Sequence, residues 1–264
     1  MEQISDLLQK MWLDYVLMNP EAERIHQLLA EKETGIVNDH IALRTFSHPK
    51  VGIDRLVEFF TPYGYTEKGT YHFEEKKLFA KHLEAEGKPK IFISELLLDQ
   101  FSNTLQEVAN SCIESISEEN MQSPSFLYSG THWKKSFKIY EELKAESEYA
   151  SWLYAIGFRP NHFTISVNDL KSFKSLNDLN HFLKENNFKL NNAGGEIKGT
   201  PEVLLEQSST LASLIEVEFD DGKKSIPGCY YEFALRYPME NNQLYQGFIA
   251  KSADKIFEST DRGY

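Results

Sequence analysis

The same order of predicted strands and helix occurs twice along the chain, and this repeat constrains the fold more than any other feature. Alternation of apolar and polar residues predicts a strand over Asp39–Phe46, and helical spacing predicts a helix over Ile53–Phe60. Three further strands are then predicted near residues 65–73, 77–83 and 90–96. Residues 39–96 therefore form a first predicted βαβββ unit.

The second half of the chain repeats this order. A strand is predicted over Asn161–Val167 and a helix over Leu176–Glu185. Three strands are then predicted near residues 202–206, 212–219 and 229–237. The segments DHIALRTF and NHFTISVN, which open the two units, share the same alternation of side chains. We therefore expect an α+β fold of paired βαβββ modules, with the second module over residues 161–237.

The segments outside the two modules are predicted to be helical. Two helices open the chain, with Ser5 as a candidate cap of the first and Asn19 as a candidate cap of the second. Pro20 suits the first turn of that second helix. Two linker helices are predicted between the modules, over residues 100–117 and 136–149. The fold is therefore expected to carry added N-terminal and linker helices.

Length and charge narrow the range of functions. A chain of 264 residues can bury a core without disulfides, and no linker is rich in Pro and Ser, so we expect residues 1–264 to form a single catalytic domain. The net charge of −12, without a basic stripe, makes nucleic acid and membrane poor partners. The sequence lacks a signal-peptide pattern and a run of about 18 apolar residues. We expect a cytoplasmic protein in which Cys112 and Cys229 stay reduced.

Candidate metal ligands occupy matching places in the two modules. Side chains alternate between the faces of a strand, so each of His40, His162 and Glu232 shares a strand face with other polar residues, opposite an apolar face. Two imidazoles and one carboxylate suit Fe(II), leaving three octahedral positions for a chelating substrate and dioxygen, and they can equally hold Zn(II). The alternative is that these are separate strand histidines and a surface glutamate. Recurrence of the two histidines favours a metal site.

Two further residues are candidates for the same site. Arg44 lies on the His40 face, so its planar guanidinium could bind a substrate carboxylate near the metal, or it could pair with an acidic neighbour. Glu95 lies in the last predicted strand of the first module, as Glu232 does in the second. Glu95 could therefore be a fourth ligand or a residue of a strand-end pair. No Walker A, GxGxxG or GxSxG pattern accompanies them, so a nucleotide cofactor is not expected.

Five segments carry a resemblance to a known family: VNDHIALRTF, KIFISEL, GFRPNHFTIS, PGCYYEFALR and the final GFIAKSADKIFEST. They resemble the 2-oxoadipate dioxygenase/decarboxylase family from about Asp39 almost to the end of the chain. The resemblance implies a vicinal-oxygen-chelate fold and a non-haem Fe(II) centre. It also implies His40, His162 and Glu232 as metal ligands, and Arg44 as the contact for a substrate carboxylate at the catalytic site.

The resemblance also implies a reaction. In the family, 2-oxoadipate and dioxygen give 2-hydroxyglutarate and carbon dioxide in a late step of lysine breakdown, so a small 2-oxo acid and O2 are the expected partners. Relatives with this activity are expected to be longer, which leaves the choice of 2-oxo acid open. Alternatives are a glyoxalase-like or ring-cleaving enzyme of the same fold, or a non-catalytic protein that binds a small acid. The sequence does not indicate an oligomeric state.

Overall fold

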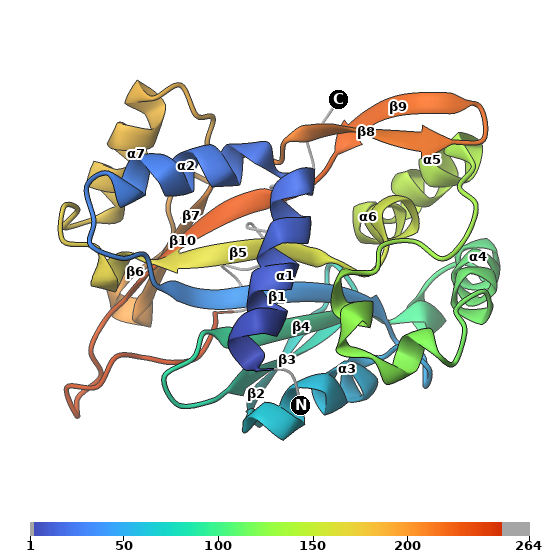
Figure 1. The fold of residues 1–264 in the computed structure, drawn as a ribbon, viewed down its shortest axis with the longest axis horizontal. Coiled ribbons are helices and arrows are strands. Elements are labelled where there is room, and N and C mark those ends of the chain that lie inside the picture. The colour runs from blue at the N-terminus through green and yellow to red at the C-terminus, as the bar shows by residue number, and fades with distance from the viewer. Residues whose placement is uncertain (1–2, 250–264) are drawn as a thin grey trace.

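The computed structural model describes residues 3–249, which fold around one eight-stranded sheet with the order β2-β3-β4-β1-β5-β10-β7-β6 (Figure 1). The strands of the first module are β1 (Asn38–Phe46), β2 (Thr66–Phe73), β3 (Leu78–Glu84) and β4 (Lys90–Leu96), with α3 (Ile53–Phe60) after β1. Those of the second are β5 (Pro160–Ser166), β6 (Lys198–Thr200), β7 (Leu205–Ser209) and β10 (Tyr230–Arg236), with α7 (Leu176–Glu185) after β5.

The two modules have the same topology, which confirms the predicted fold class. In each module the first strand runs parallel to the last, as β1 does to β4 and β5 to β10. On its other side, the last strand pairs antiparallel with a further strand of its own module, β4 with β3 and β10 with β7. The modules join through the antiparallel pairing of β1 with β5 at the centre of the sheet. One continuous sheet therefore carries both copies of the repeat.

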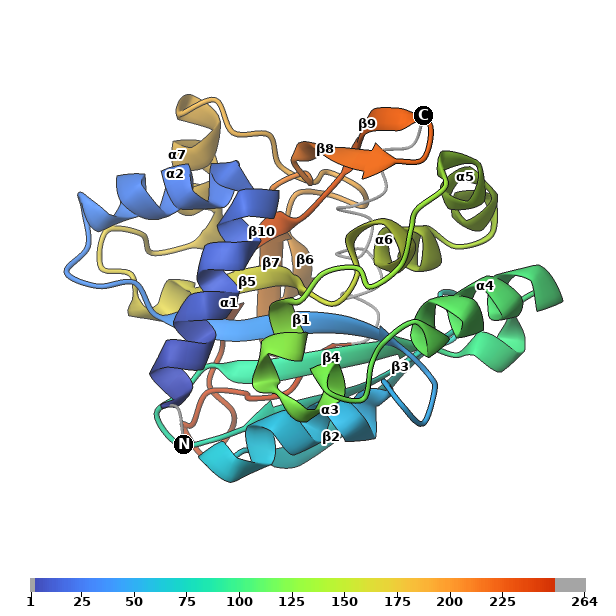
Figure 2. The ribbon, with the colours of Figure 1, turned by 45° about the vertical axis from the view of Figure 1, so that its right-hand side comes forward.

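The strands of the second module differ from the prediction. The segment predicted as a sheet strand near residues 212–219 contains β8 (Leu214–Phe219), which pairs only with β9 (Gly222–Pro227) in a separate hairpin. This hairpin lies apart from the main sheet in Figures 1 and 2. Its one-sided burial gives the same alternation as a sheet strand, so sequence periodicity could not separate the two. The strand expected at residues 202–206 starts at Leu205, and the short β6 was not predicted.

Five further α-helices of residues 3–249 pack around the sheet, and they come from the N-terminal segment and from the linker between the modules. They are α1 (Ile4–Met18), α2 (Pro20–Ala30), α4 (Asn103–Glu114), α5 (Phe137–Glu146) and α6 (Glu148–Ile156). The linker helix predicted over residues 136–149 ends before Ser147, whose side chain caps α6. Every residue from Tyr149 to Ile156 is buried, so α6 has no polar face and shows no amphipathic period.

Both predicted caps of the N-terminal helices are corrected by the structure. Ser5 lies inside α1, which starts at Ile4, so it does not cap that helix. Asn19 precedes α2 and Pro20 opens it as expected, but the Asn19 side chain makes no capping bond. Its amide instead donates to the Tyr15 hydroxyl at 2.9 Å and accepts from Ser213 Oγ at 2.8 Å. Tertiary partners at the helix junction have replaced the local cap.

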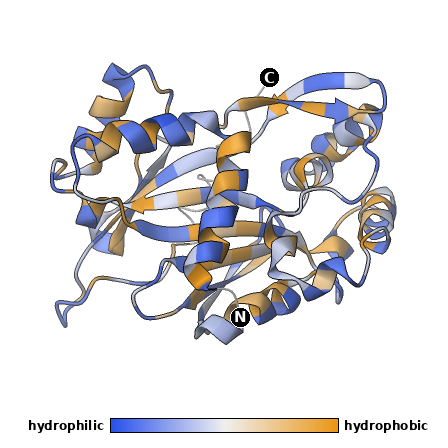
Figure 3. Cartoon of the chain, viewed as in Figure 1, coloured by the Kyte–Doolittle hydropathy of each residue, from blue (hydrophilic) through white to orange (hydrophobic). Residues whose placement is uncertain are grey.

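The two faces of the central strands have different roles. Helix α1 lies across β1 and β5 in both ribbon views, and its Trp12 and Tyr15 rings contact Phe163 with centroids 5.1 and 5.0 Å apart (Figures 1 and 2). Hydropathy alternates along these strands (Figure 3). The apolar face therefore holds the strands in place, and the opposite face is left for His40 and its neighbours. Within residues 3–249, no helix combines the length and hydrophobicity needed to cross a membrane.

We predict that Gly157, three residues before the start of the strand that carries His162, tolerates no side chain. Gly157 has a φ of 77° and a ψ of −153°, and a Cβ there would lie 2.2 Å from the carbonyl group of Gly130. Gly157→Ala should lower the free energy of unfolding by roughly 3 kcal/mol or more, because strain and overlap add. Chemical denaturation would measure this loss.

Gly64→Ala is the matched control. Gly64 also has a positive φ, of 85°, but a Cβ there would meet nothing within 4 Å. This variant should lose only the roughly 1–2 kcal/mol of a left-handed non-glycine residue. Equal losses in the two variants would show that the contact between Gly157 and Gly130 is not tight.

Candidate metal centre

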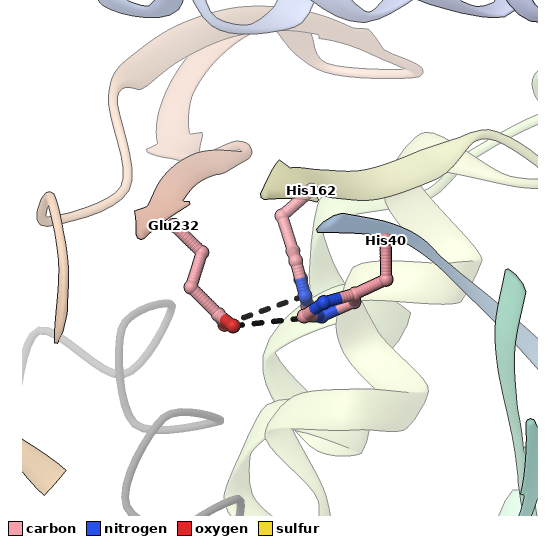
Figure 4. Close-up of side chains that lie close together, drawn as sticks. All are labelled: His40, His162 and Glu232. Carbon is pink, nitrogen blue, oxygen red and sulfur yellow. Dashed lines mark ion pairs between the residues drawn. The ribbon is translucent and has the colours of Figure 1, made fainter. Parts of the chain in front are cut away.

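Three side chains from three neighbouring strands converge on one point (Figure 4). They are His40 from β1, His162 from β5 and Glu232 from β10, and all three are buried. Their potential ligand atoms lie within 4.8 Å of one another. Glu232 Oε1 is 3.5 Å from His40 Nε2, and Glu232 Oε2 is 3.4 Å from His162 Nε2. The expected convergence of the two histidines and the glutamate is present.

The sheet register explains this convergence. In the β1–β5 pair, His40 lies opposite Thr164, and Ala42 lies opposite His162. In the β5–β10 pair, Glu232 lies beside Thr164. Residues that are register partners share a face of the sheet, so all three candidate ligands project to the same side. Each module supplies one histidine, and the second module adds the carboxylate.

The residue before each histidine holds its ring. Asp39 Oδ1 lies 2.8 Å from His40 Nδ1, and Asn161 Oδ1 lies 3.0 Å from His162 Nδ1. Because an oxygen acceptor occupies each Nδ1, the proton belongs there and each Nε2 keeps a lone pair facing Glu232. This is the arrangement that orients histidine ligands in metal sites.

A buried ion pair supports His40 from behind. The Asp39 carboxylate accepts bonds from Arg236 Nε at 2.6 Å and Nη2 at 2.8 Å. Burial favours protonated Asp39, but the Arg236 charge and its hydrogen bonds outweigh burial and lower the pKa of Asp39. Arg236 Nη1 also donates to the backbone carbonyls of Tyr245 and Gly247. The segment after β10 is thereby tied to the residue that holds His40.

Burial sets the charge of the cluster. It lowers the pKa of both His40 and His162, which keeps the imidazoles neutral. Burial also raises the pKa of Glu232 to about 8, although the hydrogen bond from Gln207 Nε2, 2.6 Å from Oε1, opposes the rise. Glu232 Oε2 is buried and has no hydrogen-bond partner in the range that the structure describes, residues 3–249. A divalent cation between the three side chains would compensate this carboxylate, so the donor set fits a metal.

Glu95 is not a fourth ligand, which corrects one of its two predicted roles. Register pairs Glu95 with Thr45, on the face opposite His40, and its Oε2 accepts from the backbone N–H of Ile53 at 2.9 Å. It therefore binds the start of α3. Comparing the β1–β4 and β5–β10 registers shows that Phe92 occupies the position equivalent to Glu232. The first module thus contributes a histidine but no carboxylate.

Arg44 lies on the His40 face of β1 but is engaged by α6. Its guanidinium carbon is 4.8 Å from the Tyr149 ring centre and 5.0 Å from that of Trp152. Its Nη1 donates to Glu148 Oε1 at 3.3 Å, a long contact for a charge-assisted bond. The ion pair that the sequence analysis offered as an alternative is therefore present. The role of Arg44 in binding substrate stays a prediction.

Several residues of the site were not predicted from the sequence. The Asp and Asn that precede the two histidines are visible as a repeated pattern, and comparing the modules could have identified them. Gln207 could not be found in this way, because the strand that carries it was expected to end before it. Of the five family-like segments, the last one, starting at Gly247, lies beyond the described residues after Ile249.

The fold and the site together define a class of protein. Paired βαβββ modules with ligands from both copies are the arrangement of the vicinal-oxygen-chelate metal proteins. A protein of Ralstonia eutropha named as a glyoxalase-superfamily member shares the fold, with 19% identity, a TM-score of 0.73 and coverage of 92% of this chain and 84% of that one. The model of the 2-oxoadipate dioxygenase/decarboxylase family matches residues 2–241. The chain belongs to this family.

Individual relatives and solved structures are similar to most of this chain. The chloroplastic 2-oxoadipate dioxygenase/decarboxylase of Arabidopsis thaliana is 36% identical over 96% of this chain and 76% of its own length. The hydroxyglutarate synthase of Oryza sativa, solved with 2-oxoadipate, has a TM-score of 0.91 at 36% identity and covers 97% of this chain and 91% of its own. A Shewanella frigidimarina protein described as a candidate hydrolase has a TM-score of 0.90 at 50% identity. The match covers 94% of this chain and 98% of that one.

We predict that removing one candidate ligand empties the site without unfolding the protein. His162→Ala and Glu232→Ala should each lose most of the bound metal, because two remaining ligands hold a divalent ion poorly. The fold should persist, since both strands are packed through their opposite faces. Elemental analysis beside circular dichroism would measure metal and fold.

His181→Ala is the control, because His181 is exposed on α7 and pairs with Glu185. Its metal content should equal that of the wild type. Unchanged metal content in both ligand variants would contradict the assignment.

Proposed function

We propose that the protein catalyses the iron-dependent oxidative decarboxylation and hydroxylation of a 2-oxo dicarboxylic acid. The proposed reaction converts 2-oxoadipate and O2 into 2-hydroxyglutarate and CO2, and its atoms balance. The observation that carries the proposal is the convergence of His40, His162 and Glu232 in a member of this family. Two histidines and one carboxylate with open positions are the donor set of non-haem Fe(II) oxygenases.

The proposed cofactor is Fe²⁺, held by His40, His162 and Glu232. When bound, the iron would supply the activation of dioxygen and the anchoring of the 2-oxo acid. The protein would supply neutral imidazoles, fixed by Asp39 and Asn161, and a carboxylate oriented by Gln207. These contacts hold the ligands before any metal arrives, which lowers the cost of organising the site.

Side chains beside the cluster would shield the reaction from water. The Phe248 ring lies 4.8 Å from both the His40 and the Phe92 rings, and Phe248 is itself buried. Apolar walls strengthen every electrostatic contact inside the site and exclude competing hydrolysis. On the other side of the cluster, Arg44 is proposed to bind a carboxylate of the substrate, in competition with Glu148.

The proposal extends to the setting of the reaction. Residues 1–264 are taken as a single catalytic domain, because ligands from both modules complete one site. The reaction would serve lysine breakdown, as the family activity implies. It would take place in the cytoplasm, where the two buried free thiols of Cys112 and Cys229 suit reducing conditions.

Oxygen uptake by iron-loaded protein tests the reaction. With 2-oxoadipate, we expect one O2 consumed and one CO2 released for each 2-hydroxyglutarate formed. Zinc-loaded protein is the control and should consume no oxygen, because Zn²⁺ has no accessible redox chemistry. Turnover of a thioester, ester or catechol without decarboxylation would instead indicate a glyoxalase-like, hydrolytic or ring-cleaving enzyme. Tight binding of the acid without any turnover would indicate a binding protein.

We predict that Arg44 selects dicarboxylic over monocarboxylic 2-oxo acids. Arg44→Ala should lose a charge-assisted contact of about 1.5–3 kcal/mol, and Arg44→Lys should also weaken binding because lysine lacks the bidentate fork. Both changes should move the ratio of kcat/KM for 2-oxoadipate over 2-oxohexanoate toward unity. Iron content should not change. Steady-state oxygen uptake with the two acids measures the ratio.

Glu148→Gln is the matched variant for this prediction. It removes the charge that pairs with Arg44 but leaves the guanidinium in place, so the preference for the dicarboxylic acid should be kept or increased. If Arg44 only braces the fold, its variants would lower the melting temperature and keep the wild-type ratio.

A further inference from the structure

Tyr230 combines three features that set it apart from the other buried tyrosines of the site. It is fully buried, its hydroxyl has no hydrogen-bond partner among residues 3–249, and its ring stacks on His162 with centroids 4.6 Å apart and an interplanar angle of 25°. Tyr149, which is also buried near Arg44, donates its hydroxyl proton to the Ser94 carbonyl at 2.7 Å. A buried hydroxyl without a partner costs free energy, so packing alone would favour phenylalanine at position 230.

The register places Tyr230 beside His162, in the row of residues that lies between the row of His40 and Glu232 and the row of Arg44. One row of residues across the sheet holds His40, Thr164 and Glu232, and the next row holds Ala42, His162 and Tyr230. Arg44 follows two residues beyond Ala42 on the same face of β1, one row further. A molecule that reached from Glu232 and His40 to Arg44 would therefore cross the row that holds Tyr230. The charges of Glu232, Arg44 and Glu148 all act on the Tyr230 phenol, which agrees with this position.

Other unpartnered polar atoms lie on the same face. Within the described part of the chain, Glu232 Oε2 and Gln207 Oε1 are both buried without a hydrogen-bond partner, as is the Tyr230 hydroxyl. Native proteins rarely leave buried polar atoms unpaired, and those that do often keep them for a ligand. A metal ion would account for the carboxylate oxygen. It would not account for the phenol, which carries a proton near neutral pH and is a hydrogen-bond donor.

We infer that Tyr230 is a substrate-positioning residue whose hydroxyl donates a hydrogen bond to a carboxylate oxygen of the bound 2-oxo acid. The inference rests on the proposed function for the identity of that acid. Stacking on His162 fixes the direction of the phenol, so its hydroxyl is held in place before the acid binds. The acid would then be held at three points: the metal, Tyr230 and Arg44.

Tyr230→Phe tests this inference, because it removes the hydroxyl and keeps the ring on His162. Calorimetry on iron-loaded protein without oxygen should show 2-oxoadipate binding weakened by about 10- to 100-fold, the loss of one hydrogen bond to a charged group. The iron content should equal that of the wild type. The melting temperature of the metal-free protein should not fall, because the hydroxyl makes no hydrogen bond to any residue that the structure describes.

Tyr231→Phe is the matched control. Tyr231 is the next residue, equally buried, but it faces the other side of the sheet, where its hydroxyl lies 3.4 Å from His26 Nδ1. This variant should bind 2-oxoadipate as the wild type does. Any loss in Tyr231→Phe should appear in the melting temperature instead. The pair therefore separates an effect on ligand from a general effect of removing a buried phenol oxygen.

The outcomes distinguish this inference from the proposed reaction. The inference is wrong if wild-type and Tyr230→Phe proteins bind 2-oxoadipate equally, or if the variant loses stability without losing affinity. Neither result contradicts the proposed reaction. If the wild type binds 2-oxoadipate but consumes no oxygen, the proposed reaction is wrong, and the binding comparison still decides the role of Tyr230. If the wild type binds no 2-oxoadipate at all, both are wrong.

Discussion

The pairing of β1 with β5 is the contact on which the site depends. These strands open the two modules, and their antiparallel register sets His40 and His162 on neighbouring rows of one face. Strand β10 then adds Glu232 through its parallel pairing with β5. A shift of one residue in either pairing would turn a ligand to the opposite face, because side chains alternate along a strand. The candidate metal site thus depends on the register between the modules and belongs to neither module alone.

The apolar face of the same strands makes this register secure. Ile41, Phe163 and Tyr231 are buried on that face, and the aromatic rings of α1 pack against the last two. A slipped strand would expose these side chains and bury polar ones, at a large cost in free energy. The core thereby stabilises an opposite face that carries neutral histidines, a buried carboxylate and the Asp39–Arg236 pair. Those groups would be costly to bury in a less constrained fold.

Sequence patterns predicted the parts of this structure that repeat. Both modules and all three converging side chains follow from strand alternation and from the two histidine-containing segments. The exceptions have separate physical causes. Helix α6 is buried all round and has no period, β6 has only three residues, and the β8–β9 hairpin alternates like a sheet strand. Glu95 was matched with Glu232 because each lies in the last strand of its module, but Glu95 is near the end of β4, and the register aligns Phe92 with Glu232.

The separation of the ligands along the chain has a consequence for biosynthesis. His40 and His162 leave the ribosome long before Glu232, and β10 pairs with β5 only after the β8–β9 hairpin has been made. Until that pairing forms, a nascent chain presents two imidazoles without the carboxylate, a pair with little power to retain a divalent ion. Such long-range pairing also forms late in folding. A metal ion held by all three side chains therefore requires a chain whose second module is complete.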